Sequence, residues 1–123
     1  MAKKKILIVD DQPDFLSIVK MRLEATGSYE IITANDGQEA LDKLKENPDL
    51  VLLDIMLPKM DGYEVTLKMK SDPHTKDIPV IMVTSLGELK STEKAFEAGA
   101  IDYVVKPFNL TVLLAKIKKA LTK

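Results

Sequence analysis

The sequence predicts one α/β domain, a doubly wound five-stranded parallel sheet with helices on both faces. Five short apolar runs, rich in β-branched residues, alternate with longer stretches whose apolar residues recur at helical spacing. Turn residues separate these segments at Asn35-Asp36-Gly37, Asp61-Gly62 and Gly99. A strand followed by a helix five times, (βα)5, is typical of a parallel sheet covered on both sides.

The five apolar runs have the length of strands. Most lack the polar alternation of a half-exposed strand, so we expect burial on both faces. In chain order they are Ile6–Val9, Tyr29–Thr33, Leu50–Leu53, Val80–Val83 and Ile101–Val105.

The stretches between and after these runs have the periodicity of amphipathic helices. From Phe15 to Leu23 the apolar residues form a broad stripe, and Pro13 stands near the first turn, where proline is tolerated. The clearest stripe follows the last run, with lysines on the opposite face. Its apolar residues are Leu110, Leu113, Leu114, Ile117 and Leu121.

Composition narrows the class of protein. The chain has 123 residues, of which 46% are hydrophobic, enough for one domain with a real core. The charges, 18 − 19 = −1, lack the basic excess of a nucleic-acid binder, so we expect no direct nucleic-acid partner. There is no cysteine, which excludes disulfides and cysteine-ligated zinc. The longest N-terminal apolar run is too short for a signal peptide or a membrane span, so we expect a cytoplasmic protein without membrane insertion.

Polar residues stand where four of the predicted strands end. Asp10-Asp11 follows the first strand, Asp54 the third, Thr84 the fourth and Lys106 the fifth. Ligands of open parallel sheets bind outside the carboxyl ends of the strands, so if these strands are neighbours we expect the side chains to converge. Clustered carboxylates repel one another, and a hard divalent cation such as Mg²⁺ relieves that repulsion. A carboxylate can also attack phosphorus to form an aspartyl phosphate.

The same residues, taken in order, resemble the receiver domains of response regulators in two-component signalling, the CheY-like family. The resemblance spans essentially the whole chain, 1–123, and implies the flavodoxin-like strand order 2-1-3-4-5. The motifs that carry it are Ile8-Val9-Asp10-Asp11, Leu52-Leu53-Asp54-Ile55-Met56-Leu57-Pro58-Lys59-Met60-Asp61-Gly62, Pro79-Val80-Ile81-Met82-Val83-Thr84, Ala98-Gly99-Ala100-Ile101-Asp102-Tyr103 and Lys106-Pro107-Phe108.

The resemblance implies a role for each residue at the strand ends. Asp54 is expected to accept a phosphoryl group from a histidine kinase or a histidine phosphotransfer protein. Asp10, Asp11 and Asp54, with the main-chain carbonyl of Met56, are expected to bind Mg²⁺ (Mn²⁺ would also serve). Lys106 is expected to pair with a phosphoryl oxygen. The Lys106-Pro107 peptide bond is expected to be cis.

The resemblance also implies a conformational switch and bears on the lifetime of the phosphoryl group. Thr84 and Tyr103 are expected to move together on phosphorylation and to change the surface that binds a downstream protein. The chain would catalyse only its own phosphorylation and dephosphorylation. In the family, the residues two after the phosphoacceptor and two after the threonine overlook the approach of the attacking water, and here they are Met56 and Leu86. Neither hydrogen-bonds water strongly, so we expect slow self-dephosphorylation compared with motility-type receivers that carry polar residues there.

Several other interpretations stay open. Asp10 and Asp11 could merely cap a helix, and Tyr103 could merely pack within a strand.

Other functions of the same fold fit less well. A haloacid-dehalogenase-like phosphatase would use Asp10 as its nucleophile and needs a second acid two residues later, where Gln12 stands. Flavodoxin-like carriers and nucleotide binders need glycine- or hydroxyl-rich phosphate loops, which are missing. His74 lies in a polar stretch and is expected to be solvated. The main alternative function is a phosphate-independent interaction module of the same fold. Because no domain follows the last predicted helix, a single-domain protein is favoured.

Overall fold

The computed structural model describes residues 3–85 and 91–122, and it confirms the predicted α/β class. The strands are β1 (Lys4–Val9), β2 (Tyr29–Ala34), β3 (Leu50–Asp54), β4 (Val80–Ser85) and β5 (Asp102–Lys106). The helices are α1 (Pro13–Glu24), α2 (Gly37–Lys43), α3 (Gly62–Lys70), α4 (Ser91–Ala98) and α5 (Leu110–Leu121). A single 3₁₀ turn, η1 (Leu44–Glu46), extends α2.

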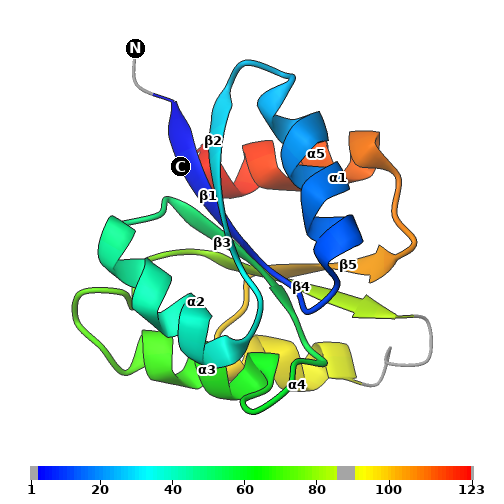
Figure 1. The fold of residues 1–123 in the computed structure, drawn as a ribbon. Coiled ribbons are helices and arrows are strands. Elements are labelled where there is room, and N and C mark those ends of the chain that lie inside the picture. The colour runs from blue at the N-terminus through cyan, green and yellow to red at the C-terminus, as the bar shows by residue number, and fades with distance from the viewer. Residues whose placement is uncertain (1–2, 86–90, 123) are drawn as a thin grey trace.

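All strand pairs in the sheet are parallel, and their order is β2-β1-β3-β4-β5 (Figure 1), as the resemblance implied. The chain order of the strands reverses direction at β1 and β3, which are direct neighbours with Val9 opposite Leu53. In sheets of this kind the ligand crevice lies at that reversal, beyond the carboxyl ends of the strands.

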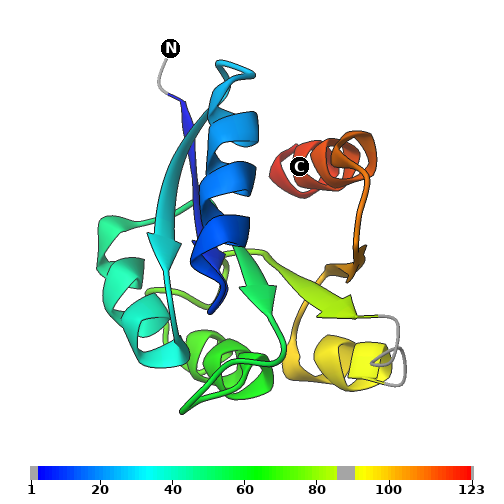
Figure 2. The ribbon, with the colours of Figure 1, turned by 45° about the vertical axis from the view of Figure 1, so that its right-hand side comes forward.

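Helices cover both faces of the sheet, as Figure 2 shows, and an apolar layer lies between the sheet and the helices on each face. Alternate residues of β1 enter opposite layers because side chains alternate across a strand. Leu7 and Val9 join the layer under α2, α3 and α4, whereas Ile6 and Ile8 join the layer under α1 and α5. All of β3 is buried, which explains why its sequence shows no polar alternation.

The helix starts follow from local side-chain chemistry. Pro13 occupies the first turn of α1, where the missing N–H costs nothing. The side chains of Asp36, Asp61 and Asn109 accept backbone N–H groups at the starts of α2, α3 and α5. Each such cap stabilises its helix by about 1 kcal/mol. Asp61 therefore fixes where α3 begins, a short distance along the chain from the end of β3.

The predicted strand limits were close but not identical to those observed. β1 begins earlier than predicted, at Lys4, because its first residues pair with β2 at the edge of the sheet. β5 begins at Asp102, because Ile101 is 48% exposed and precedes the first register pair with β4. Among the described residues, no helix is both long and apolar enough to cross a membrane.

Candidate functional site

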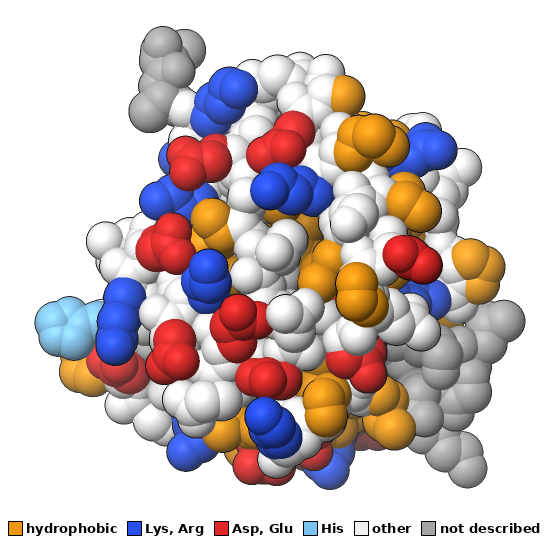
Figure 3. Space-filling model, in the orientation of Figure 1, with side chains coloured by type: hydrophobic (Ala, Val, Ile, Leu, Met, Phe, Trp, Pro, Cys, Tyr) orange, Lys and Arg blue, Asp and Glu red, His pale blue; other side chains and the backbone are white. Residues whose placement is uncertain are grey.

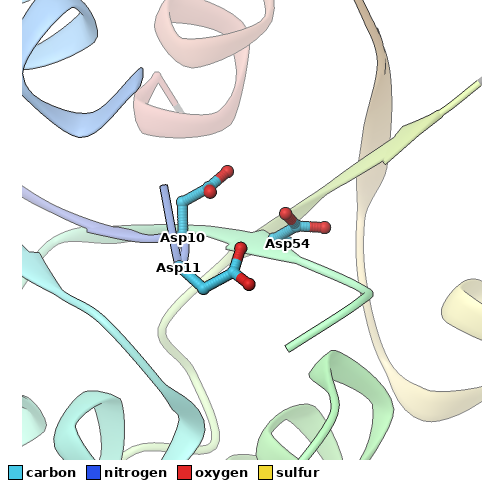
Figure 4. A group of neighbouring side chains, drawn as sticks. All are labelled: Asp10, Asp11 and Asp54. Carbon is cyan, nitrogen blue, oxygen red and sulfur yellow. The ribbon is translucent and has the colours of Figure 1, made fainter. Parts of the chain in front are cut away.

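Three carboxylates converge at the carboxyl edge of the central strands. Asp10 and Asp11 directly follow β1, and Asp54 ends β3, so the pairing of these two strands brings them together. One oxygen of each carboxylate lies within 4.8 Å of the others. Figure 4 shows the three side chains turned toward one shared space. The sequence predicted this convergence correctly.

Asp10 is the most buried of the three acids, with 1% of its surface exposed. Its Oδ1 accepts the backbone N–H of Gln12 at 2.9 Å, which ties the carboxylate to the turn that leads into α1. Its Oδ2 accepts from the Lys106 ammonium at 2.5 Å. Asp11, by contrast, is exposed. The site therefore has a closed inner side at Asp10 and an open side at Asp11.

Asp54 occupies the middle of the site and is 8% exposed. Its Oδ1 accepts the Met56 backbone N–H at 3.1 Å, and its Oδ2 accepts from Lys106 at 3.2 Å. Burial raises the pKa of Asp54, and the charge of Asp10 raises it further. Lys106 and the Met56 N–H oppose these effects, and the pKa is about 6. At pH 7 the ionised form of Asp54 still predominates, but its burial lowers the stability of the folded protein.

Lys106 reaches this cluster from the end of β5 and lies between Asp10 and Asp54. Burial lowers the pKa of its ammonium, but the hydrogen bond to Asp10 and the charges of both acids outweigh burial, and the pKa is raised. Lys106 is thus a fixed cation in the site. The sequence predicted that Lys106 joins the cluster; its short contact with Asp10 was not predicted. The Lys106-Pro107 peptide bond is cis, as expected.

Gly62 closes the loop between β3 and α3 against the backbone of Asp54. Its N–H donates to the carbonyl of Ile55 at 2.9 Å. A Cβ at this position would lie 2.6 Å from the carbonyl oxygen of Asp54, closer than atoms can approach. Only glycine fits this contact without a shift of the backbone. The Asp61-Gly62 pair, read from the sequence as a turn, therefore also sets the position of Asp54.

Thr84 and Tyr103 lie on the two strands beyond β3. Thr84 is 2% exposed and follows Val83, the residue opposite Asp54 in the sheet. The Tyr103 ring packs edge-on against Phe96 of α4, with centroids 6.1 Å apart, and Lys116 of α5 lies 5.2 Å from its centroid. Tyr103 therefore joins β5 to both flanking helices.

Three further residues were named from the sequence: Met56, His74 and Leu86. The Met56 side chain, 62% exposed, stands at the open side of the loop after Asp54. His74 is exposed, as expected. Leu86 lies outside the described residues.

Comparison with known families agrees with this geometry. The family model described as the response regulator receiver domain matches residues 6–118, nearly the whole chain. The chain belongs to this family. The three acids, Thr84 and Lys106 all lie within the matched span, so the receiver-domain match covers every strand end that contributes to the site.

Several relatives of this receiver domain are named as transcriptional regulators. The chain is 46% identical over 122 residues to the probable transcriptional regulator ycf27 of Cyanophora paradoxa, covering 98% of the chain and 49% of that protein. It is 40% identical to the alkaline phosphatase synthesis transcriptional regulatory protein PhoP of Bacillus subtilis, with 98% and 49% covered. The chain spans about half the length of the curated relatives it matches.

Solved structures show the same fold. A putative response regulator from Chloroflexus aurantiacus aligns with a TM-score of 0.93 at 35% identity, covering 99% of this chain and 100% of that one. The chemotaxis protein CheY4 of Vibrio cholerae aligns with a TM-score of 0.90 at 32% identity, covering 98% and 100%. The chain is thus a receiver domain of two-component response regulators, in fold and in family.

One neighbour of the site was missed at the sequence level. The ring of Phe15, in the first turn of α1, lies 4.1 Å from the Lys106 ammonium. In the sequence, Phe15 was identified only as the start of an apolar stripe. Its position five residues after Asp10, at the helix start that Asp10 itself supports, is the signal that could have placed it near the site.

Proposed function

We propose that residues 1–123 form a phosphoacceptor receiver domain in which Asp54 is the nucleophile. The observation that supports this most is the set of three carboxylates within 4.8 Å, two of which share the Lys106 ammonium. A pKa near 6 leaves Asp54 mainly ionised at pH 7, with a lone pair available for attack. The phosphate-independent alternative has no observation in its favour.

The transfer is a single displacement at phosphorus. An oxygen of Asp54 forms a bond to the phosphorus of a phosphohistidine, and the phosphorus–nitrogen bond breaks. The leaving imidazole keeps that electron pair and takes up a proton from solvent. Positive charge beside the equatorial oxygens lowers the barrier to such transfers. Lys106, already 3.2 Å from Asp54, supplies that charge from the protein.

A divalent cation fits the same cluster. When ionised, Asp10, Asp11 and Asp54 carry three negative charges against the one positive charge of Lys106. Hard oxygen ligands of this kind suit Mg²⁺, or Mn²⁺ in its place. The three carboxylates and the Met56 carbonyl would hold the ion. When bound, it supplies positive charge to the phosphoryl oxygens.

Thr84 and Tyr103 would transmit the phosphorylated state. A phosphoryl group adds about −1.5 to −2 charges beside the Thr84 hydroxyl, which would move toward it. Tyr103 would then turn, and its contacts with Phe96 and Lys116 would change the α4–β5–α5 surface. The downstream protein binds this altered surface. A valine at position 84 should remove the difference in partner affinity between the free protein and its beryllofluoride complex.

Met56 bears on the lifetime of the phosphoryl group. Its exposed thioether stands beside Asp54 and is a weak hydrogen-bond acceptor for an attacking water. Slow self-dephosphorylation follows from this arrangement. The domain catalyses only its own phosphorylation and dephosphorylation, and it receives its phosphoryl group from a histidine kinase or phosphotransfer protein. It makes no direct contact with nucleic acid. One relative of about twice its length is named as a DNA-binding regulator.

The test is phosphoryl uptake from acetyl phosphate with and without Mg²⁺. The parent protein should be labelled only with Mg²⁺, and Asp54→Asn should not be labelled. Asp77→Asn, an exposed aspartate that precedes β4 at the opposite edge of the sheet, is the matched control and should be labelled like the parent. Labelling of Asp54→Asn at the parental rate would refute Asp54 as the acceptor.

A further inference from the structure

The Lys106 ammonium has an aromatic partner as well as two carboxylates. Its nitrogen lies 4.1 Å from the centroid of the Phe15 ring, 2.5 Å from Asp10 Oδ2 and 3.2 Å from Asp54 Oδ2. The face of an aromatic ring is negative and attracts a cation at such a distance. The Lys106 side chain is 22% exposed, so this attraction is only partly screened by water.

The Phe15 ring is itself held in place. It packs edge-to-face against Phe108, with centroids 5.7 Å apart and planes at 83°. It also lines an apolar groove between α1 and the start of α5, together with Ile18, Pro107 and Leu110. Figure 3 shows apolar side chains gathered toward the α1 side of this face, while charged side chains are interspersed over the α2 side.

Lys106 needs such a restraint because its side chain is long. Four rotatable bonds let a lysine ammonium adopt many positions, and three N–H donors let it choose among partners. Asp10 offers the shorter hydrogen bond and, without a third contact, would compete with Asp54 for the ammonium. The ring of Phe15 supplies that third contact from α1, an element that contributes neither acid.

We propose that Phe15 is a positioning residue for phosphoryl transfer, whose ring face holds the Lys106 ammonium where it can pair with the phosphoryl group on Asp54. This inference rests on the proposed function. It adds that α1 takes part in the reaction through an aromatic face and not only through packing. A cation–π contact of this exposure corresponds to roughly a 2- to 30-fold effect on an equilibrium or rate.

The test exploits the electronic origin of the contact. Phenylalanine with one, three or five ring fluorines, placed at position 15 of the full chain, weakens the negative ring face stepwise while almost keeping its shape. The rate of phosphorylation by acetyl phosphate at saturating Mg²⁺ should fall stepwise with fluorination. Phe15→Leu should fall furthest, by up to about 30-fold, and Phe15→Tyr should retain most of the parental rate.

Phe108 provides the matched control. Among the described residues, cations lie over the rings of Phe15, Tyr63 and Tyr103, and Phe108 is not one of these. The same fluorination series at position 108 perturbs the aromatic pair but removes no ammonium contact, and should change the rate by less than about twofold.

The outcomes are distinct. Rates that do not vary with fluorination at position 15, or that vary equally at positions 15 and 108, would overturn the inference and leave the proposed function standing. A folded parent that takes up no phosphoryl group would overturn the proposed function, and the role of Phe15 with it.

Discussion

Replacing Asp54 with asparagine should stabilise the metal-free protein at neutral pH. The pKa of Asp54 rises from 3.8 to about 6 on folding, mainly because the carboxylate is buried. The difference, 6 − 3.8 = 2.2, multiplied by 1.36 kcal/mol for each pKa unit, gives about 3 kcal/mol. This is the free energy by which folding disfavours the ionised form, and asparagine, which has nearly the same shape, removes it. About 3 kcal/mol corresponds to roughly 10 °C in melting temperature for a domain of this size.

The same pKa shift also predicts how the stability difference between Asp54→Asn and the parent depends on pH. Because the folded pKa lies above the unfolded pKa, the contribution of Asp54 to stability is fully present below about pH 4 and is lost as the pH rises through about 6. The advantage of Asp54→Asn should therefore be near zero at pH 4, grow between pH 4 and 6, and be constant above pH 7.

The assay is urea unfolding in the presence of a chelator, at steps between pH 4 and pH 8. Asp77→Asn, at an exposed position, serves as the control and should track the parent throughout. An Asp54→Asn protein that is less stable than the parent at pH 7, or whose difference from the parent does not vary with pH, would refute the assignment of Asp54 as a buried, disfavoured carboxylate.

The other predictions concern the ion, the loop and the phosphoryl lifetime. Millimolar Mg²⁺ should raise the melting temperature of the parent, because it binds where the fold gathers the acids, and should raise that of Asp11→Asn less; an unmoved parental melting curve would contradict the site. Gly62→Ala should lower the free energy of unfolding by about 1–3 kcal/mol, because its Cβ would meet the carbonyl of Asp54 at 2.6 Å. Parental stability in chemical denaturation would show that the loop can shift at no cost. Met56→Asn, alone and with Leu86→Glu, should speed phosphate release, because a polar side chain can hold the attacking water. Equal phosphate-release time courses in parent and double variant would mean that water access is controlled elsewhere.

Much of the fold could be predicted because its signals are local. β3 is buried on both faces, and a strand in that position must be apolar throughout, so Leu50–Leu53 could be identified from composition alone. The ends of the strands were harder to predict. Lys4, the first residue of β1, pairs with β2 through its backbone, but its side chain is exposed and carries no strand signal.

The candidate site could be predicted where residues stand at strand ends. Once β1 and β3 are parallel neighbours, as the family resemblance implied, Asp10 and Asp54 come together at one edge of the sheet. The contact of Lys106 with Phe15 could not be predicted in this way. The position of Phe15 soon after Asp10 could have placed it near the site, but its contact with the ammonium depends on the direction in which α1 leaves β1 and on side-chain rotamers.

The most direct test of phosphoacceptor chemistry at Asp54 is to identify the residue that carries the phosphoryl group. Borohydride reduces an aspartyl phosphate to the corresponding alcohol, which peptide mass spectrometry locates on the chain. After incubation of the parent with acetyl phosphate and Mg²⁺, position 54 should be converted, and chelation of the ion should prevent it. Conversion at another acidic residue, or none in a folded protein that binds Mg²⁺, would contradict the account.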